Sequence, residues 1–388
     1  MSFRMSALLL TFLVWGCSTT PSRVTSDVEQ YLHDDLFPNH LSAQIETSED
    51  VFALSEEMKL FISEHVMRQR SPVAQLKTLS RGIFEHSDIG IMYQNDANTV
   101  AAETFANGTA NCLSLTIMTY ALADHAGFGV DFQQVNVPEF WIRRQGSSIL
   151  NRHINLKLYQ KGRDLDTLFR KQAYTIDFNQ VSGTSYFSKN LISKPRVLSL
   201  FYNNKGVDYL LVNDFDTAYA YFKKGIMTDP LLSDSYTNLG VLYRKVGQDE
   251  WAEKIYQKAL TMSPGDNTTL ENLSTLYRAT DRASEAEQID RVLMAERRAN
   301  PYYHFLLGEQ ALEQRDLNKA ESHFTQAIKL HSRNHEFYFA MARTMFLMGN
   351  NKASQRYMNL ALRYSESESD ELRYQYKLNS YSQLDKRP

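Results

Sequence analysis

The chain has 388 residues, of which 43% are hydrophobic and 22% charged, and its 42 basic and 45 acidic residues give a net charge of −3. These values are typical of a globular protein, and they exclude low-complexity disorder, collagen and a multi-span membrane protein. No basic stripe stands out, so no nucleic-acid partner is expected. The length predicts two or three domains. The two cysteines, Cys17 and Cys112, are too few for a disulfide framework.

The first residues predict an export signal rather than part of a fold. Arg4 supplies a positive charge, and residues 7–14 form an apolar run that only Thr11 interrupts. This run is too short for a bilayer, which needs about 20 residues, and it is typical of a secretory signal. It ends in Val-Trp-Gly-Cys17.

This ending resembles the lipobox of bacterial lipoproteins, in which a small residue precedes a lipidated cysteine that becomes the mature N-terminus. The resemblance implies a signal peptide over residues 1–16, lipidation of Cys17, and a tether over residues 17–26, which are rich in Ser, Thr and Pro. Because Ser18 rather than Asp follows Cys17, it also implies a Gram-negative outer membrane and a protein that faces the periplasm. The alternative is an ordinary signal peptide or an uncleaved anchor, in keeping with the bulky Trp15.

Residues 27–198 predict an α+β domain with an N-terminal helical part. Helical periodicity covers residues 49–70 and 73–85, and alternation typical of strands covers residues 130–137, 154–158 and 174–179. Gly108 is expected to end one helix. A second helix is expected to begin near Asn111 or Cys112 and to end at Gly127.

Cys112 is therefore expected at a helix N-terminus, where the helix dipole favours a thiolate. The alternative is a buried cysteine that acts as a small hydrophobic residue. A nucleophilic cysteine needs a base within hydrogen-bond reach. His125 lies on the same helix at a distance of about 20 Å, which is too far. His153 is then the remaining histidine of the domain that follows Cys112.

His153 begins a strand in which polar and apolar residues alternate. We expect its side chain to point away from the apolar layer formed by Ile154, Leu156 and Leu158, toward a cleft. If this strand pairs antiparallel with residues 174–179, either Asp177 or Asn179 lies beside His153. Such a group would orient the imidazole and stabilise its cationic form.

The order of cysteine on a helix, histidine on a strand and aspartate on a strand resembles the transglutaminase-like branch of the papain-like fold, over about residues 88–180. The resemblance rests on Asn-Gly-Thr-Ala-Asn-Cys112-Leu-Ser, Asn-Arg-His153-Ile-Asn and Tyr-Thr-Ile-Asp177-Phe-Asn. It implies that Cys112 is the nucleophile, His153 the general base and acid, and Asp177 the residue that orients His153. Family members often carry an aromatic residue after this histidine, where Ile154 stands here.

Two site assignments stay open. Asp166, in a connector between strands, is the alternative third residue. The oxyanion hole would combine the backbone N–H of Cys112 with a side chain, for which Gln134 is a candidate.

A second pattern repeats every 34 residues from residue 199 to residue 368. Small residues recur at Gly206, Gly240, Ser274, Gly308 and Ala342, and again at Ala218, Ala252, Ala286, Ala320 and Ser354. Large residues recur at Phe222, Tyr256, Phe324 and Met358, with Asp290 as the exception. The pattern resembles the tetratricopeptide (TPR) repeat. It implies an all-α solenoid of five repeats, followed over residues 369–388 by a capping helix and a tail, with Tyr374 and Leu378 at helical spacing.

Solenoids of this kind offer a concave groove to a peptide or protein, which is the expected partner besides the membrane. The residues expected to face the groove are Asn203, Thr237, Glu271, Phe305 and Phe339. The two phenylalanines could equally pack between repeats, and the array could serve only to support the neighbouring domain.

Taken together, these features predict a membrane-anchored thiol enzyme that acts on an amide or peptide bond, with hydrolysis favoured over cross-linking. The alternative is a tethered, non-catalytic scaffold that binds proteins through its repeats. Neither a cofactor nor a metal is expected, because the sequence has no His-Glu-x-x-His, no Cys-x-x-Cys, no P-loop and no Gly-x-Gly-x-x-Gly motif.

Overall fold

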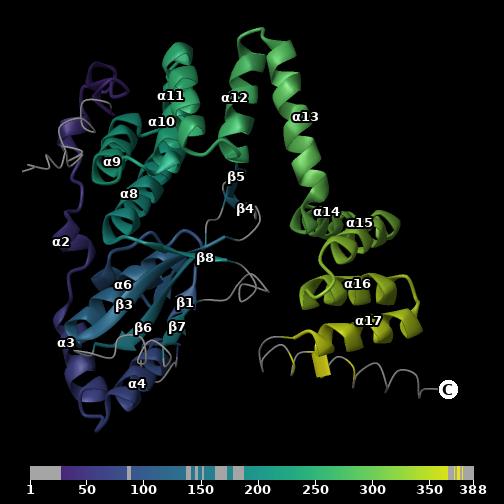
Figure 1. Ribbon diagram of the computed structural model, residues 1–388, viewed down its shortest axis with the longest axis horizontal. Coiled ribbons are helices and arrows are strands. Elements are labelled where there is room, and N and C mark those ends of the chain that lie inside the picture. Colours follow the sequence, from purple (N-terminus) through teal and green to yellow (C-terminus); the bar gives the residue numbers. More distant parts are fainter. Residues whose placement is uncertain are drawn as a thin grey trace, which may run out of the picture.

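The computed structural model describes residues 28–84, 89–136, 141–144, 147–150, 153–161, 173–177 and 188–365, together with Glu371, Tyr374, Gln375 and Leu378. These residues form an α+β unit followed by an arch of helix pairs (Figure 1). No helix within these ranges is both long enough and apolar enough to cross a membrane. The predicted signal peptide and tether, with Cys17, lie outside the described residues.

The α+β unit is built on an antiparallel sheet with the strand order β7-β6-β3-β8. Its strands are β3 (Phe128–Val135), β6 (His153–Gln160), β7 (Tyr174–Ile176) and β8 (Lys189–Ile192). Two small pairs accompany it: β1 (Met92–Tyr93) lies parallel to β2 (Thr109–Ala110), and β4 (Trp141–Arg144) lies antiparallel to β5 (Ser147–Leu150). The sequence did not predict β8, because its residues Lys-Asn-Leu-Ile do not alternate between apolar and polar side chains.

The helical part before the sheet differs from the expected pair of helices. It contains α2 (Ser48–Val51), α3 (Glu56–Phe61), a π-helical turn (Ile62–Val66) and α4 (Pro72–Phe84). The prediction of one helix over residues 49–70 is wrong, because the chain leaves the helix after α2 and starts again at Ser55. The Ser55 side chain accepts a hydrogen bond from Met58 N and so caps α3. Burial of Val51, Met58 and Phe61 in one core produced the periodicity.

The two predicted helix boundaries around Cys112 are confirmed. Helix α5 (Ala101–Asn107) ends at Gly108, which adopts the left-handed conformation with φ of 64°. Helix α6 (Cys112–His125) begins after Asn111, whose side chain accepts a hydrogen bond from Ser114 N. Gly127, with φ of 82°, follows its end. Helix α6 packs against β3 and β6 and supplies the centre of the core of the α+β unit.

The first helix of the array belongs to both parts of the protein. Helix α8 (Lys194–Leu211) contributes Val197 and Phe201 to the core of the α+β unit, whereas its Leu210 lies in the core of the array. The predicted boundary between residues 198 and 199 therefore runs through a continuous helix. The helix starts at Lys194 because Ser193 caps it and a proline occupies its first turn.

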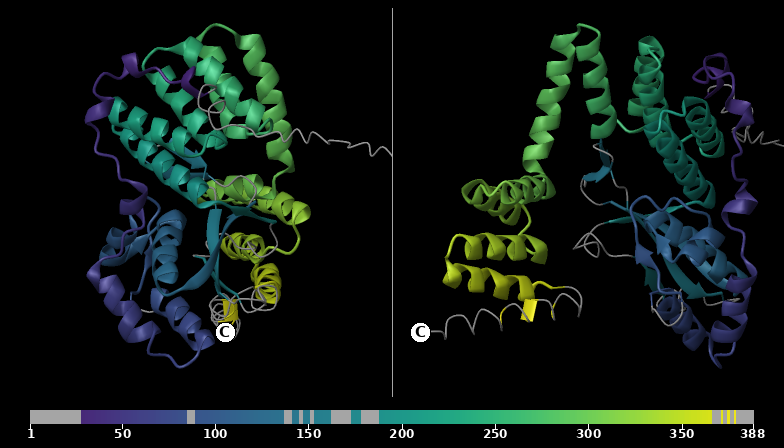
Figure 2. Two further views of the ribbon diagram at one scale, coloured as in Figure 1. Left: turned by 60° about the vertical axis from the view of Figure 1, so that its left-hand side comes forward. Right: turned by 180° about the vertical axis from the view of Figure 1, so that it is seen from behind.

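The array consists of antiparallel helix pairs, and their order matches the predicted repeat. After α8 come α9 (Phe215–Thr228), α10 (Ser233–Lys245), α11 (Asp249–Met262), α12 (Asn267–Ala279), α13 (Ala283–Ala299), α14 (Pro301–Glu313), α15 (Leu317–Leu330), α16 (His335–Leu347) and α17 (Asn351–Arg363). The first pairs pack on the α+β unit, and the later pairs descend on the other side of the arch (Figures 1 and 2). Tyr374 and Leu378 are helical and buried at the end of the array, where a capping helix was predicted.

The repeated small residues make room for the repeated large ones. A Cβ atom added to Gly206, Gly240 or Gly308 would lie 2.5, 2.4 or 2.4 Å from the ring of Phe222, Tyr256 or Phe324, respectively. In the third pair the two residues that depart from the pattern compensate each other, since Ser274 Oγ donates a hydrogen bond of 2.7 Å to Asp290 Oδ1. A polar contact there replaces the contact between glycine and an aromatic ring.

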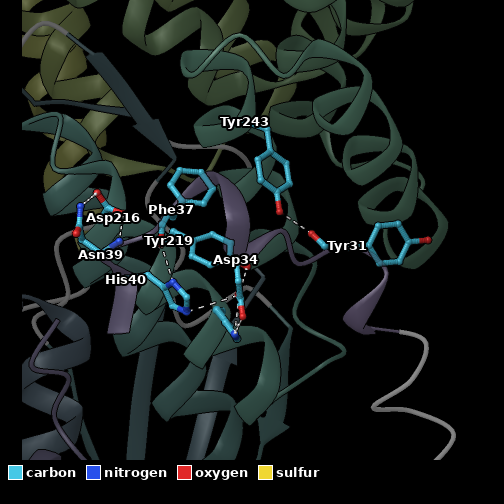
Figure 3. A network of polar contacts seen from close by, with 9 residues as sticks. Tyr31, Asp34, Phe37, Asn39, His40, Asp216, Tyr219 and Tyr243 are labelled. Carbon is cyan, nitrogen blue, oxygen red and sulfur yellow. Dashed lines mark hydrogen bonds and ion pairs between the residues drawn. The ribbon is translucent and has the colours of Figure 1, made fainter. Parts of the chain in front are cut away.

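Residues 28–46, here called the N-terminal strap, lie along the first two helix pairs (Figure 3). Phe37 is buried and stacks on the ring of Tyr219 in α9, with centroids 4.4 Å apart. Tyr219 donates a hydrogen bond of 2.7 Å to Asp34, and the backbone N–H of Asn39 donates to Asp216 of α9. The sequence prediction included these residues in the α+β domain. Most of the strap packs on the array instead, because the apolar side chains from Val28 to Phe37 join the core of the array, whereas Ile45 contacts the core of the α+β unit.

Candidate active site

Cys112 occupies the first position of α6, as predicted. Its side chain is 7% exposed, and the capping side chain of Asn111 fixes the backbone immediately before it. The backbone N–H groups at this end of the helix have no partner within the helix, so their partial positive charge favours an anion. This position therefore suits a thiolate, although the burial also agrees with the alternative of a packed cysteine.

His153 begins β6 and contacts Cys112. Its Nδ1 atom lies 3.4 Å from Cys112 Sγ. The expectation that His153 faces an open cleft is wrong in one respect, because its side chain is only 2% exposed. Both faces of β6 are buried, since Ile154 on one face is as enclosed as Asn155 on the other.

Asp177 follows β7 directly and contacts the other side of the His153 ring. Strands β6 and β7 pair antiparallel, as predicted, and the register that sets Leu156 opposite Ile176 brings Asp177 beside Asn155. The distance from His153 Nε2 is 2.7 Å to Asp177 Oδ1 and 2.9 Å to Oδ2. Of the two other candidates for this role, Asp166 and Asn179, neither lies within the described residues.

Asn155 is a site residue that the sequence analysis did not single out. Its Nδ2 donates a hydrogen bond of 2.8 Å to Asp177 Oδ2, and its side chain is buried. The available signal was its position two residues after His153, which puts both side chains on the same face of the strand. Asn155 therefore helps to hold the Asp177 carboxylate toward the imidazole.

The charges around His153 stabilise its protonated form. Burial alone would lower the pKa of His153, but the hydrogen bonds to Asp177 and Cys112, with the charges of both groups, raise it to about 10. The ring is therefore an imidazolium at neutral pH, with one N–H directed at Sγ and the other at Asp177.

Gln134 is not placed to complete an oxyanion hole beside His153. In the pairing of β3 with β6, Val135 lies opposite His153 and Gln134 lies opposite Ile154. Residues paired in this way share a face of the sheet, so Gln134 lies on the face away from His153. Gln133, one residue earlier, lies on the same face as His153 and is buried.

The residues expected to line the groove of the array are mostly packed between helices. Asn203 is buried and accepts a hydrogen bond from Asn238, and Thr237 is buried against Thr269. These two predictions are wrong, because polar contacts between neighbouring helices occupy both side chains. Phe305 packs on Phe337 and Phe339 on Tyr374, whereas exposed Glu271 forms an ion pair with Arg297. Within the described part of the chain, no group of three or more His, Cys, Asp or Glu side chains is arranged to hold a metal.

The similarities of this chain to known proteins concern its helical array. Residues 235–268 match the tetratricopeptide repeat family, and no curated protein matches the chain. Among solved structures, pilF of Pseudomonas aeruginosa is 17% identical, with 50% of this chain and 92% of that chain covered and a TM-score of 0.27. MamA of Desulfovibrio magneticus is 14% identical, with 43% and 94% covered and a TM-score of 0.25.

A third solved structure is YrrB, described as a TPR protein with an unusual peptide-binding site. It is 16% identical, with 46% of this chain and 92% of that chain covered and a TM-score of 0.24. TM-scores this low support no inference, so the assignment rests on the matched residues 235–268 and on the helix pairs themselves. The C-terminal part of the chain is an all-helical TPR-like solenoid, the type of scaffold that binds proteins and peptides.

Proposed function

We propose that the protein is a membrane-anchored cysteine enzyme with a transglutaminase-like α+β domain, and that Cys112 attacks an amide or peptide bond. The observation that carries the proposal is the continuous chain of contacts from Cys112 Sγ to His153 Nδ1 and from His153 Nε2 to Asp177. A thiol, an imidazole and a carboxylate in this order are the groups that activate a nucleophile in thiol hydrolases.

The proposed reaction has two stages. In the first, the Cys112 thiolate adds to the amide carbonyl carbon, and the C–N bond then breaks as the leaving amine takes the proton of the His153 imidazolium. In the second, water attacks the thioester and gives a proton to His153, and the C–S bond breaks to release a carboxylic acid and the thiolate. Asp177 stays ionised and holds the imidazole in place throughout.

An amine in place of water would turn the second stage into transamidation. We favour hydrolysis because bacterial proteins with the resemblance described above include peptidases and amidases as well as cross-linking enzymes. Incubation of the active protein with a candidate amide substrate in ¹⁸O water separates the two reactions. Hydrolysis puts the label into the product acid, whereas transamidation leaves the label out and joins the acyl group to an added amine.

The test of the thiol chemistry is the reactivity of Cys112 in full-length protein that carries Cys17→Ser, where it is the sole thiol. Iodoacetamide should alkylate Cys112 readily at pH 6, and His153→Ala should slow this reaction by at least about tenfold. His125→Ala is the matched control, because this exposed histidine ends the same helix and should leave the rate unchanged. Equal rates in wild type and His153→Ala would refute the proposed activation.

The membrane anchor is part of the same proposal. Lipidation of Cys17 would attach the protein to the outer membrane with the enzyme in the periplasm, and the support for it is the sequence Val-Trp-Gly-Cys17 after the short apolar run. A clickable fatty-acid analogue should label the wild type in cells. Labelling of Cys17→Ser at the same level would remove the anchor from the proposal.

The second candidate function is a tethered scaffold whose α+β domain has no catalytic role. The match of residues 235–268 to the TPR family favours protein or peptide binding by the array. Cys112→Ala distinguishes the two functions, since it removes the nucleophile and leaves the array intact. A strain with normal amounts of Cys112→Ala should resemble a deletion strain if the protein is an enzyme, and the wild type if it is a scaffold.

A further inference from the structure

A chain of side-chain hydrogen bonds runs from the array to the start of α6. Asp208 of α8 accepts a hydrogen bond of 2.7 Å from Asn98 Nδ2. Asn98 Oδ1 accepts one of 2.7 Å from Asn111 Nδ2, and Asn111 Oδ1 accepts one of 2.9 Å from Ser114 N. The last of these bonds caps α6, and Asn111 directly precedes Cys112.

The loop that carries Asn98 is fixed to the same helix. Ser114 Oγ donates to the carbonyl oxygen of Ala97 and accepts a hydrogen bond of 3.0 Å from Thr99 N. Asn98 is 8% exposed, and so is Asn111. Because both amides are buried, a reversed orientation of either one would leave polar groups without hydrogen-bond partners.

Two side chains of α8 set the direction of these hydrogen bonds, because Asp208 accepts from Asn98 Nδ2 and Asn204 Nδ2 donates a hydrogen bond of 3.4 Å to Asn98 Oδ1. An ionised carboxylate can only accept, so Asn98 must turn its NH₂ group toward Asp208 and its oxygen toward Asn111. Asn111 must then use its NH₂ group on Asn98, which leaves its oxygen free to cap Ser114 N. If Asn98 were reversed, its NH₂ group would face Asn111, and Asn111 would have to turn its oxygen toward Asn98. The NH₂ group of Asn111 would then face the N–H of Ser114, and the cap of α6 would be lost.

We propose that Asp208 is a positioning residue through which the first helix of the array controls the reactivity of Cys112. Helix α8 packs on the core of the α+β unit and also on α9, where Gly206 receives the ring of Phe222. Displacement of α8 by a protein or peptide bound to the array therefore moves Asp208, and the N-cap of α6 weakens or tightens accordingly. The inference rests on the proposed function of Cys112.

The experiment reverses the direction of this series of hydrogen bonds. In Cys17→Ser protein that also carries Asn204→Ala, which removes the second donor to Asn98 Oδ1, Asp208→Asn allows Asn98 to take both orientations. Iodoacetamide alkylation of Cys112 should then slow by about fivefold, the size expected for loss of an N-cap. In the Asn111→Asp background the opposite holds. The new carboxylate at position 111 can only accept, so it needs the NH₂ group of Asn98. Asp208→Asn lets Asn98 turn that group toward position 111, so this substitution should increase the rate at which Cys112 is alkylated.

Asp229→Asn is the matched control. This carboxylate also contacts α8, through an ion pair of 2.6 Å with Arg196, but it has no link to Asn98. It should leave the alkylation rate within about twofold of the wild type. A thermal melt of each variant identifies any that fail to fold.

Hydrogen exchange of the Ser114 amide reports on the cap without any thiol chemistry. Asp208→Asn should speed this exchange in the Asn111 background and slow it in the Asn111→Asp background. The same direction of change in both backgrounds, for exchange and alkylation, would overturn the role of Asp208. If instead His153→Ala alkylates as fast as wild type while the exchange data reverse as expected, the proposed function fails and the link between array and helix stands.

Discussion

Replacement of Asp177 by asparagine should lower the pKa of His153 and change how stability depends on pH. The variant keeps the size of the side chain and one oxygen that can accept from Asn155, but it removes the negative charge that lies 2.7 Å from His153 Nε2. Because that hydrogen bond and charge oppose the effect of burial, the pKa of His153 in the variant should fall by about one to three units from its value of about 10.

The size of the effect on stability follows from the same values. A rise in the pKa of His153 from 6.5 to about 10 corresponds to about 5 kcal/mol of differential interaction, shared between Asp177 and Cys112. The folded pKa lies above the unfolded one, so this stabilisation is complete below about pH 6.5 and is lost as the pH rises to about 10. Asp177→Asn should therefore cost about 3 kcal/mol at pH 6 and much less near pH 10.

Two measurements check this prediction. An NMR titration of ¹³C-labelled histidine gives the pKa of His153, and urea unfolding at pH 6 and pH 9.5 gives the free energy of unfolding. Asp131→Asn is the control, because this carboxylate of β3 accepts a hydrogen bond from Tyr159 and is not among the groups that shift the pKa of His153. A pKa of His153 that is the same in wild type and Asp177→Asn, or a stability loss that does not change with pH, would refute the reasoning.

Two further predictions concern the array. Gly240→Ala should destabilise it by about 1–3 kcal/mol, because the new Cβ would lie 2.4 Å from the ring of Tyr256, whereas Gly265→Ala meets no atom within 4 Å and should be close to neutral in urea unfolding. Phe37→Ala should cost about 3 kcal/mol and expose the strap to limited proteolysis, since Phe37 is 2% exposed, whereas the 85%-exposed Leu41 should tolerate alanine; equal protease resistance of the two variants would contradict this role for the strap.

The array was the part of the fold that the sequence predicted best, because the packing rule is local. Each small residue faces a large residue of the partner helix, so the rule repeats at a fixed spacing of 34 residues. The third repeat departs from the pattern for a reason visible only in space, the hydrogen bond between Ser274 and Asp290. The N-terminal strap has no periodicity at all, so nothing in its sequence showed that it packs on the array.

The candidate site was predictable where it depends on local geometry. A helix N-terminus, the alternation of a strand and an assumed antiparallel pairing predicted that Cys112 and His153 lie together with either Asp177 or Asn179. Only the resemblance to the transglutaminase-like branch singled out Asp177. Gln134 shows how strongly such a prediction depends on the position within a strand, since a shift of one residue moves a side chain to the opposite face. The contact between Asn98 and Asp208 spans 110 residues of sequence, and no local pattern could have indicated it.

The way the two parts of the protein are joined limits how the array can serve the site. Helix α8 is continuous across the junction, and the strap makes a second connection, because Glu46 accepts hydrogen bonds from Tyr202 of α8 and Tyr221 of α9. With two connections, a shift of the first helix pair when a partner binds passes to the α+β unit, whereas a flexible linker would absorb it. A partner held by these first repeats would stay at a fixed distance from Cys112, which raises its effective concentration at the site.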